Sequence, residues 1–185
     1  MGRSGAIALG LPIILSLIVT SSLWARKKIE MPDNFGTSEW AVANYKEAVG
    51  YLKYIADNEV RQKLLSVPEN LRLEAWEEFW KKHDPVSSTP ENEFRDQYFA
   101  RIGYANEEFG AILQPGWLTD RGEVWIRLGE PNSIEKFTMR AGGNDLEVWN
   151  YWVPRDVYLV FLDRAGVGDF YLLNPSDMLD EVFFR

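Results

Sequence analysis

The segment GWLTDRG (116–122) contains residues whose types and spacing could form a binding or catalytic site. Asp120 and Arg121 are adjacent, so a carboxylate and a guanidinium could together bind a polar ligand, and loops are common places for such sites. The same residues suit a turn, because Thr119 or Asp120 can bond backbone amides and Gly122 can adopt a positive φ. Both interpretations stay open. We favour the turn, with Arg121 paired to a carboxylate elsewhere.

A second group of polar side chains lies on one predicted helix at residues 90–109: Asn92, Glu93, Arg95 and Arg101. Asn92 and Arg95 are three residues apart and therefore share a side of that helix. Glu93 could reach Arg121 across the junction between the helix and a following strand. We expect this network to fix the junction. A dense and buried cluster of charges would instead indicate a ligand site.

The sequence contains few residues that suit metal binding or nucleophilic catalysis. The sequence has no cysteine and one histidine, His83, which disfavours thiolate catalysis and metal sites built from Cys or His. His83 precedes Asp84 at a predicted helix end, where the helix dipole by itself favours a histidine. Motifs for nucleotide binding, serine hydrolysis and zinc proteolysis do not occur. We therefore expect no metal and no cofactor, and the sequence favours a protein that is not an enzyme.

The two parts of the chain differ in charge. Of the 20 Lys and Arg residues, four lie in the first 30 positions, as does one of the 28 Asp and Glu residues. Residues 31–185 therefore carry 16 basic and 27 acidic groups, a formal net charge of −11. A phosphate-neutralising patch is not expected on such a domain, which argues against a nucleic-acid partner.

An uncharged apolar segment begins at Ala6 and ends at Ala25. Twenty helical residues rise about 30 Å, the thickness of the hydrocarbon core of a bilayer. Trp24 and the basic residues after it suit an interfacial anchor, whereas small residues near the end of the segment suit a cleaved signal peptide. Residues 1–28 are thus predicted to be a transmembrane anchor or a signal peptide, followed by a linker at residues 29–39.

Apolar periodicity predicts helices in the next part of the chain. They are expected at residues 40–56, in a short segment carrying Val60, Leu64 and Leu65, at residues 66–82 and at residues 90–109. Ser66 is expected to begin the second long helix through a capping box. Ser88 or Thr89 is expected to cap the last one, with a proline in its first turn.

The apolar period changes after Gly116. Val124, Ile126 and Leu128 alternate with their neighbours, which predicts a half-buried strand. Further strands are expected at residues 134–139, 146–152, 157–162 and 170–173.

Helices followed by strands indicate an α+β fold. After the N-terminal membrane or signal helix, we expect a helical region at about residues 40–110 packed on a small antiparallel sheet at about residues 116–175. Both parts belong to one domain at residues 40–185.

Six motifs in order carry a family resemblance: FW-x-x-x-DP (79–85), TPENEFR (89–95), YANEEFG (104–110), GWLTDRG (116–122), GEP (129–131) and E-x-W-x-Y (147–151). Together they resemble the GWxTD domain over roughly residues 40–175. The resemblance implies a bacterial envelope protein on the periplasmic side and an α+β domain. It implies no mechanism, because no activity is assigned to that family.

Two functions remain open for the exported domain. The first is an anchored interaction or assembly module, in which the Trp-rich sheet face or the GWLTD loop, which contains Trp117, binds another envelope protein. The second is a small hydrolase or ligand-binding domain for glycan or peptide, with Asp120, Arg121, Glu93 and Arg101 lining its pocket. The missing catalytic spacing and the apolar N-terminal segment favour the first.

Overall fold

The structure is a computed structural model that describes residues 29–86, 88–111, 114–138, 145–152 and 156–173. The membrane or signal helix expected at residues 6–25 lies outside these residues. In the described part of the chain, no helix has both the length and the apolar character needed to cross a membrane. The described chain is α+β, as expected, with six α-helices and a four-stranded antiparallel sheet.

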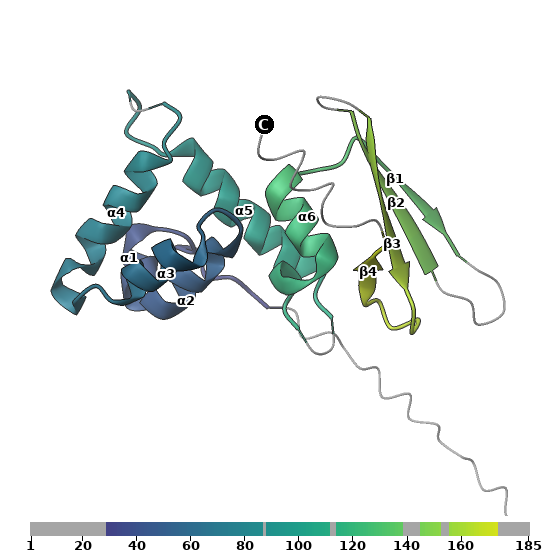
Figure 1. The fold of residues 1–185 in the computed structure, drawn as a ribbon, viewed down its shortest axis with the longest axis horizontal. Helices are drawn as coiled ribbons and strands as arrows, with labels where there is room; N and C mark the ends of the chain where they lie inside the picture. Colours follow the sequence, from purple (N-terminus) through teal and green to yellow (C-terminus); the bar gives the residue numbers. More distant parts are fainter. Residues whose placement is uncertain (1–28, 87, 112–113, 139–144, 153–155, 174–185) are drawn as a thin grey trace, which may run out of the picture.

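Four helices form one end of the molecule (Figure 1): α1 (Ser38–Ala43), α2 (Tyr45–Tyr51), α3 (Asn58–Leu65) and α4 (Arg72–Lys82). The single helix expected at residues 40–56 is wrong, because Asn44 interrupts it with φ −119° and ψ 39°. The amide of Asn44 donates to the carbonyl of Trp40 at 3.0 Å, so this side chain competes with the helical backbone and stabilises the break. A 3₁₀ turn at Leu52–Tyr54 follows α2.

Part of the expected linker belongs to the core. The ring of Phe35 lies 4.7 Å from the ring of Trp40 and 5.2 Å from the ring of Phe99. Gly36 has φ +85° and packs directly against the side chain of Phe99, so a larger residue would not fit there. The folded domain therefore begins before residue 40.

Two helix starts also differ from expectation. Ser66 ends α3 and donates to the carbonyl of Lys63 at 2.7 Å, and a 3₁₀ turn at Glu69–Leu71 leads into α4. The long helix α5 (Glu93–Glu108) is capped by Asn92 rather than by Ser88 or Thr89. Ser and Asn are both good caps, so composition alone did not distinguish between these positions.

The strand expected at residues 123–128 is wrong, because these residues belong to helix α6 (Asp120–Leu128). Trp125 is as apolar as its neighbours, and Val124, Trp125 and Ile126 are all buried. Helix α6 lies between α5 and the sheet, so three consecutive apolar residues can be buried. In the sequence, every second residue of this segment is also apolar, which fits the pattern of a strand.

The sheet forms the other end of the molecule (Figure 1) and contains β1 (Ser133–Phe137), β2 (Asp145–Tyr151), β3 (Val157–Asp163) and β4 (Phe170–Leu172) in that order. All neighbouring strands are antiparallel, and the four strands lie close to the expected positions. Side chains alternate between two faces. The inner face packs on α5 and α6, where the ring of Trp149 lies 5.4 Å from the ring of Phe109 and 6.2 Å from the ring of Trp125.

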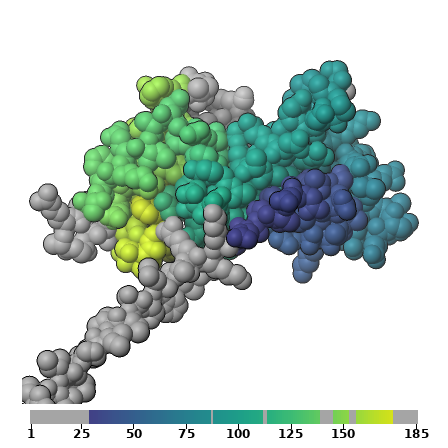
Figure 2. Space-filling view, turned by 180° about the vertical axis from the view of Figure 1, so that it is seen from behind, coloured from purple at the N-terminus to yellow at the C-terminus, as the bar shows by residue number. Residues whose placement is uncertain are grey.

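Aromatic side chains fill most of the core. One group, around Trp80 and Phe99, joins the helices at one end, and a second, around Trp149, joins α5 and α6 to the sheet. Figure 2 shows the two ends from behind as one elongated body, with the helical end coloured from purple to teal and the last strand in yellow. Several aromatic residues are exceptions, above all Trp152 and Tyr158, which are 62% and 61% exposed.

Candidate functional site

The two glycines of GWLTDRG allow the backbone to approach closely. A Cβ atom at Gly116 would collide with the backbone of Ala105 in α5, and one at Gly122 would collide with the carbonyl of Gly116. Gly122 is helical, so the positive φ expected for it is wrong. The motif therefore needs glycine because α6 starts in direct backbone contact with the 3₁₀ turn at Gly116–Leu118 and with α5.

Trp117 is held by both its backbone and its ring. Its N–H donates to Oδ1 of Asn106 at 3.1 Å, and its carbonyl accepts from the hydroxyl of Tyr54 at 2.8 Å. Its ring lies 4.8 Å from the ring of Tyr51, so Trp117 joins the helical end of the molecule to the junction. Leu118, the variable position of the motif, is 37% exposed.

Thr119 is the N-cap of α6. Its buried side chain donates to the carbonyl of Gly116 at 2.7 Å and accepts from the N–H of Gly122 at 3.1 Å. This pair of bonds satisfies one of the amides that every helix start leaves open. Asp120 begins the helix, and its Oδ2 accepts from the backbone N–H of Leu172 in β4 at 2.7 Å. The carboxylate thus binds the sheet.

Arg121 is buried and pairs with Glu147, as the favoured interpretation expected of a carboxylate elsewhere in the chain. Its Nη1 lies 3.4 Å from both carboxylate oxygens of Glu147, and its Nη2 donates to the carbonyl of Gly168 at 3.1 Å. The guanidinium carbon lies 3.9 Å from the ring centroid of Phe170 and 5.2 Å from that of Phe109. Six per cent of each charged residue is exposed, so the pair is removed from bulk water.

The inward-facing residues of β2 complete this network and account for the E-x-W-x-Y motif. Nε1 of Trp149 donates to Glu147 at 3.1 Å, and Nζ of Lys136 lies 3.3 Å from the same carboxylate. The hydroxyl of Tyr151 donates to the carbonyl of Gly129 at 3.0 Å. Successive inward positions therefore bind the start and the end of α6.

Arg101 and Gly129 define the end of α6. Nη1 of Arg101 donates to the carbonyl of Ile126 at 3.1 Å, which satisfies a carbonyl of the last helical turn. Gly129 has φ +82° and lies directly against the same guanidinium, so the positive φ and the close approach both favour glycine. Burial lowers the pKa of Arg101 and raises the pKa of the neighbouring Tyr151.

The other three predicted residues lie at the opposite end of α5. Asn92 caps α5 and donates to the carbonyl of Trp80 at 2.7 Å, whereas Arg95 forms an exposed ion pair with Asp96. Glu93 accepts from the hydroxyl of Thr89 at 3.0 Å. The expected pair between Glu93 and Arg121 is wrong, because Arg121 pairs with Glu147 and contacts the ring of Phe109, which follows α5, whereas Glu93 begins this helix of about 24 Å.

Sequence reasoning missed three residues of the junction: Asn106, Glu147 and Asp163. Glu147 belongs to the E-x-W-x-Y motif and Asn106 to the YANEEFG motif. The motifs did not indicate what either side chain binds. Asp163 is buried at the end of β3 and accepts from the N–H groups of Ala165, Val167 and Gly168. A buried carboxylate that accepts several backbone amides shapes a loop, here the loop whose carbonyl binds Arg121.

Fold and site together define a small α+β domain in which the GWLTDRG segment joins a helical region to an antiparallel sheet. The GWxTD domain family model matches residues 34–165, and the chain belongs to this family. No curated protein and no solved structure has significant similarity to the chain. The family's motif is therefore explained here from contacts: Gly116 for close packing, Trp117 and Thr119 for backbone bonds, and Asp120 for the sheet.

Proposed function

We propose that this protein is an interaction module of the bacterial cell envelope that docks another protein on the outer face of its sheet. One observation carries the proposal. A row of apolar side chains crosses all four strands on the face turned away from α5 and α6: Phe137, Leu146, Leu162 and Tyr171. Each residue of the row is the direct register partner of the next, so the side chains are nearest neighbours on one face.

The size of the exposed apolar surface supports a docking role. Phe137 is 49%, Tyr171 44%, Tyr158 61% and Trp152 62% exposed. Four aromatic side chains that are each about half exposed offer on the order of 400 Å². Exposed or half-buried Val148, Val160 and Leu173 extend this surface toward the roughly 800 Å² that one partner contributes to a stable interface. Contiguous apolar patches of this size mark interaction sites.

Charge indicates the chemistry of the partner. Residues 31–185 carry a formal net charge of −11, which opposes both a second copy of the chain and an anionic lipid surface. Glu135 is the one charged residue among the described strand residues of the outer face. The complementary surface is an apolar patch of another protein, rimmed by Lys and Arg residues.

The proposed location rests on sequence. The uncharged residues 6–25 suit an anchor or an export signal, and the family resemblance suits the periplasmic side of the envelope. A domain held near a membrane by such a segment meets its partner at a raised effective concentration, so a moderate interface is sufficient.

The contacts of the junction support this function better than hydrolysis. Asp120 and Glu147 hold the backbone and a buried arginine, and Arg101 holds the end of α6. Glu93 is exposed at the far end of α5. A glycan or peptide hydrolase needs two carboxylates that face one cleft. These groups instead have partners within the fold.

A targeted disruption of the outer face tests the proposal. The full-length protein is purified from its native membranes in mild detergent, and the proteins that stay bound are quantified by mass spectrometry. Phe137→Glu places a charge in the apolar row, and Leu73→Glu is the matched control because Leu73 is 47% exposed on α4. We expect one stoichiometric partner that binds wild type and Leu73→Glu, is lost with Phe137→Glu, and binds more slowly as salt rises.

Three outcomes would overturn this function. The first is a partner that Phe137→Glu retains in full. The second is self-association of the purified chain that Phe137→Glu abolishes, which would assign the face to a second copy. The third is binding to lipid vesicles through the same face.

A further inference from the structure

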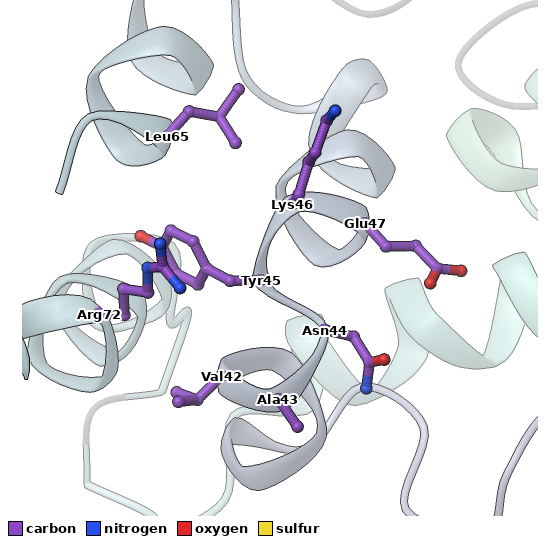
Figure 3. Close-up of a pocket in the computed structure, with 8 residues that line it drawn as sticks. All are labelled: Val42, Ala43, Asn44, Tyr45, Lys46, Glu47, Leu65 and Arg72. Carbon is purple, nitrogen blue, oxygen red and sulfur yellow. The ribbon is translucent and has the colours of Figure 1, made fainter. Parts of the chain in front are cut away.

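A second surface feature lies at the helical end, away from the sheet. It is an open hollow of about 600 Å³ between the junction of α1 and α2 and the start of α4 (Figure 3), lined by residues 42–47 together with Leu65 and Arg72. Two of the lining residues are cations, Lys46 and Arg72. The hollow shares no residue with the GWLTDRG junction or with the outer sheet face.

The guanidinium of Arg72 is held in a defined orientation. Its Cζ lies 5.0 Å from the ring centroid of Tyr45, and Figure 3 shows it in front of that ring. The hydroxyl of Tyr45 donates to the carbonyl of Leu64 at 3.1 Å, which fixes the ring. Burial raises the pKa of Tyr45 and the charge of Arg72 opposes this shift, so the phenol stays neutral near pH 7 and is not a counter-ion.

Arg72 keeps its hydrogen-bonding capacity. Within the described part of the chain, its guanidinium donates no hydrogen bond and forms no ion pair, and its Nε is shielded from solvent without a partner. A guanidinium that contacts a ring through its face directs its N–H groups outward in the plane. Such a planar fork matches the two oxygens of a carboxylate.

The surroundings favour an anion that carries an apolar group. Glu47 is the one carboxylate among the lining residues, and it accepts from the hydroxyl of Tyr51 at 3.0 Å. Its side chain points away from Arg72 in Figure 3. Leu65, which is 36% exposed, and half-buried Val42 provide apolar surface in the same hollow as Arg72.

We propose that this hollow binds a carboxylate that is held next to an apolar group, as in Asp or Glu beside Leu or Phe. Arg72 would bind the two carboxylate oxygens, and Leu65 and Val42 would contact the apolar group. Lys46 points away from Arg72 (Figure 3) and would contribute only long-range attraction. This site is independent of the docking face, because the two surfaces lie at opposite ends of the molecule (Figure 1).

Nuclear magnetic resonance titration of the full chain in mild detergent tests the site. The probe is N-acetyl-leucyl-glutamate amide, and its glutamine analogue is the matched ligand control. Isovalerate distinguishes a free acid from a peptide, and inorganic phosphate tests for a general anion site. We expect saturable shifts at the backbone amides of Tyr45, Lys46 and Arg72 with the glutamate peptide and none with its glutamine analogue.

Variants locate the binding. Arg72→Met keeps the apolar stem and should weaken binding at least about tenfold, because the charge-assisted hydrogen bonds to the carboxylate are lost. Arg72→Lys should give an intermediate loss, since it keeps the charge without the fork. Lys46→Met at an exposed position should weaken binding less. Lys53→Met is the control, because Lys53 also lies over a tyrosine ring, that of Tyr54, but outside the hollow.

The outcomes are decisive in both directions. Retained binding by isovalerate would support the site and assign it to small organic acids, whereas binding of the peptide alone would support it and assign it to acidic protein segments. Equal binding of the glutamine analogue or of phosphate would overturn the proposal. So would unchanged binding by Arg72→Met and Lys46→Met when both spectra show a folded chain.

Discussion

The carboxylate of Asp120, in the first turn of α6, accepts a hydrogen bond of 2.7 Å from the backbone N–H of Leu172 in β4. This bond joins residues 52 positions apart in the sequence. It attaches the short edge strand β4 to helix α6, which precedes the sheet. The aspartate of the GWxTD motif therefore binds the backbone of the sheet.

Removing this bond should loosen β4. Asp120→Ala should lower the free energy of unfolding by about 1.5–3 kcal/mol, because a hydrogen bond to a charged group is lost. Asp120→Asn keeps an acceptor oxygen and should cost less. Urea unfolding followed by tryptophan fluorescence measures the stability, and amide hydrogen exchange at Leu172 measures the local effect. Unchanged exchange at Leu172 in Asp120→Ala would contradict this role.

Breaking the buried ion pair should be more costly. Arg121→Met and Glu147→Gln should each destabilise the chain by about 3–5 kcal/mol, because the remaining charge is left buried without its partner. The double variant Arg121→Met/Glu147→Gln should lose less than the sum of the two single losses. A double-mutant cycle in urea provides the measurement. Additive losses would show that the two side chains do not interact.

The glycine of the motif should tolerate no side chain. Gly116→Ala should unfold the domain or lower its melting temperature sharply, because the new Cβ atom would overlap the backbone of α5. Gly50→Ala is the matched control, since no atom lies within 4 Å of its Cβ position in α2. That control should be neutral or stabilising by up to about 1 kcal/mol. Thermal unfolding followed by circular dichroism measures the melting temperatures. Equal melting temperatures for the two variants would contradict the prediction.

High pH should destabilise the domain. Burial raises the pKa of Tyr51, Tyr98 and Tyr151 above the ordinary value of 10.0. Below pH 10 these phenols are neutral in both states, so their contribution to stability is complete. Above pH 10 the unfolded chain loses protons that the folded chain retains, and the free energy of unfolding should fall by up to about 1.4 kcal/mol per pH unit for each tyrosine. Urea unfolding between pH 8 and pH 11.5 measures this, and Tyr98→Phe should reduce the slope.

The candidate site illustrates which inferences the sequence supports. The expectation that Arg121 pairs with a carboxylate elsewhere in the chain is confirmed, because a buried guanidinium requires such a partner. The partner of Arg121 is Glu147 of the E-x-W-x-Y motif, and not Glu93 as the sequence suggested. Spacing along one helix predicts neighbours within that helix, but it carries no information about which strand residue lies opposite.

The α+β order, the four strands after residue 130 and the family could be predicted from the sequence, because these depend on local periodicity and on short motifs. The tertiary structure was needed to show that residues 120–128 are helical, since the spacing of Val124, Ile126 and Leu128 over so short a segment also fits a strand. It also decided that Asp120, Arg121 and Glu147 have partners within the fold, and that Phe137 and Tyr171 share one exposed face. Those relationships depend on strand register and on packing between distant segments, which no local pattern records.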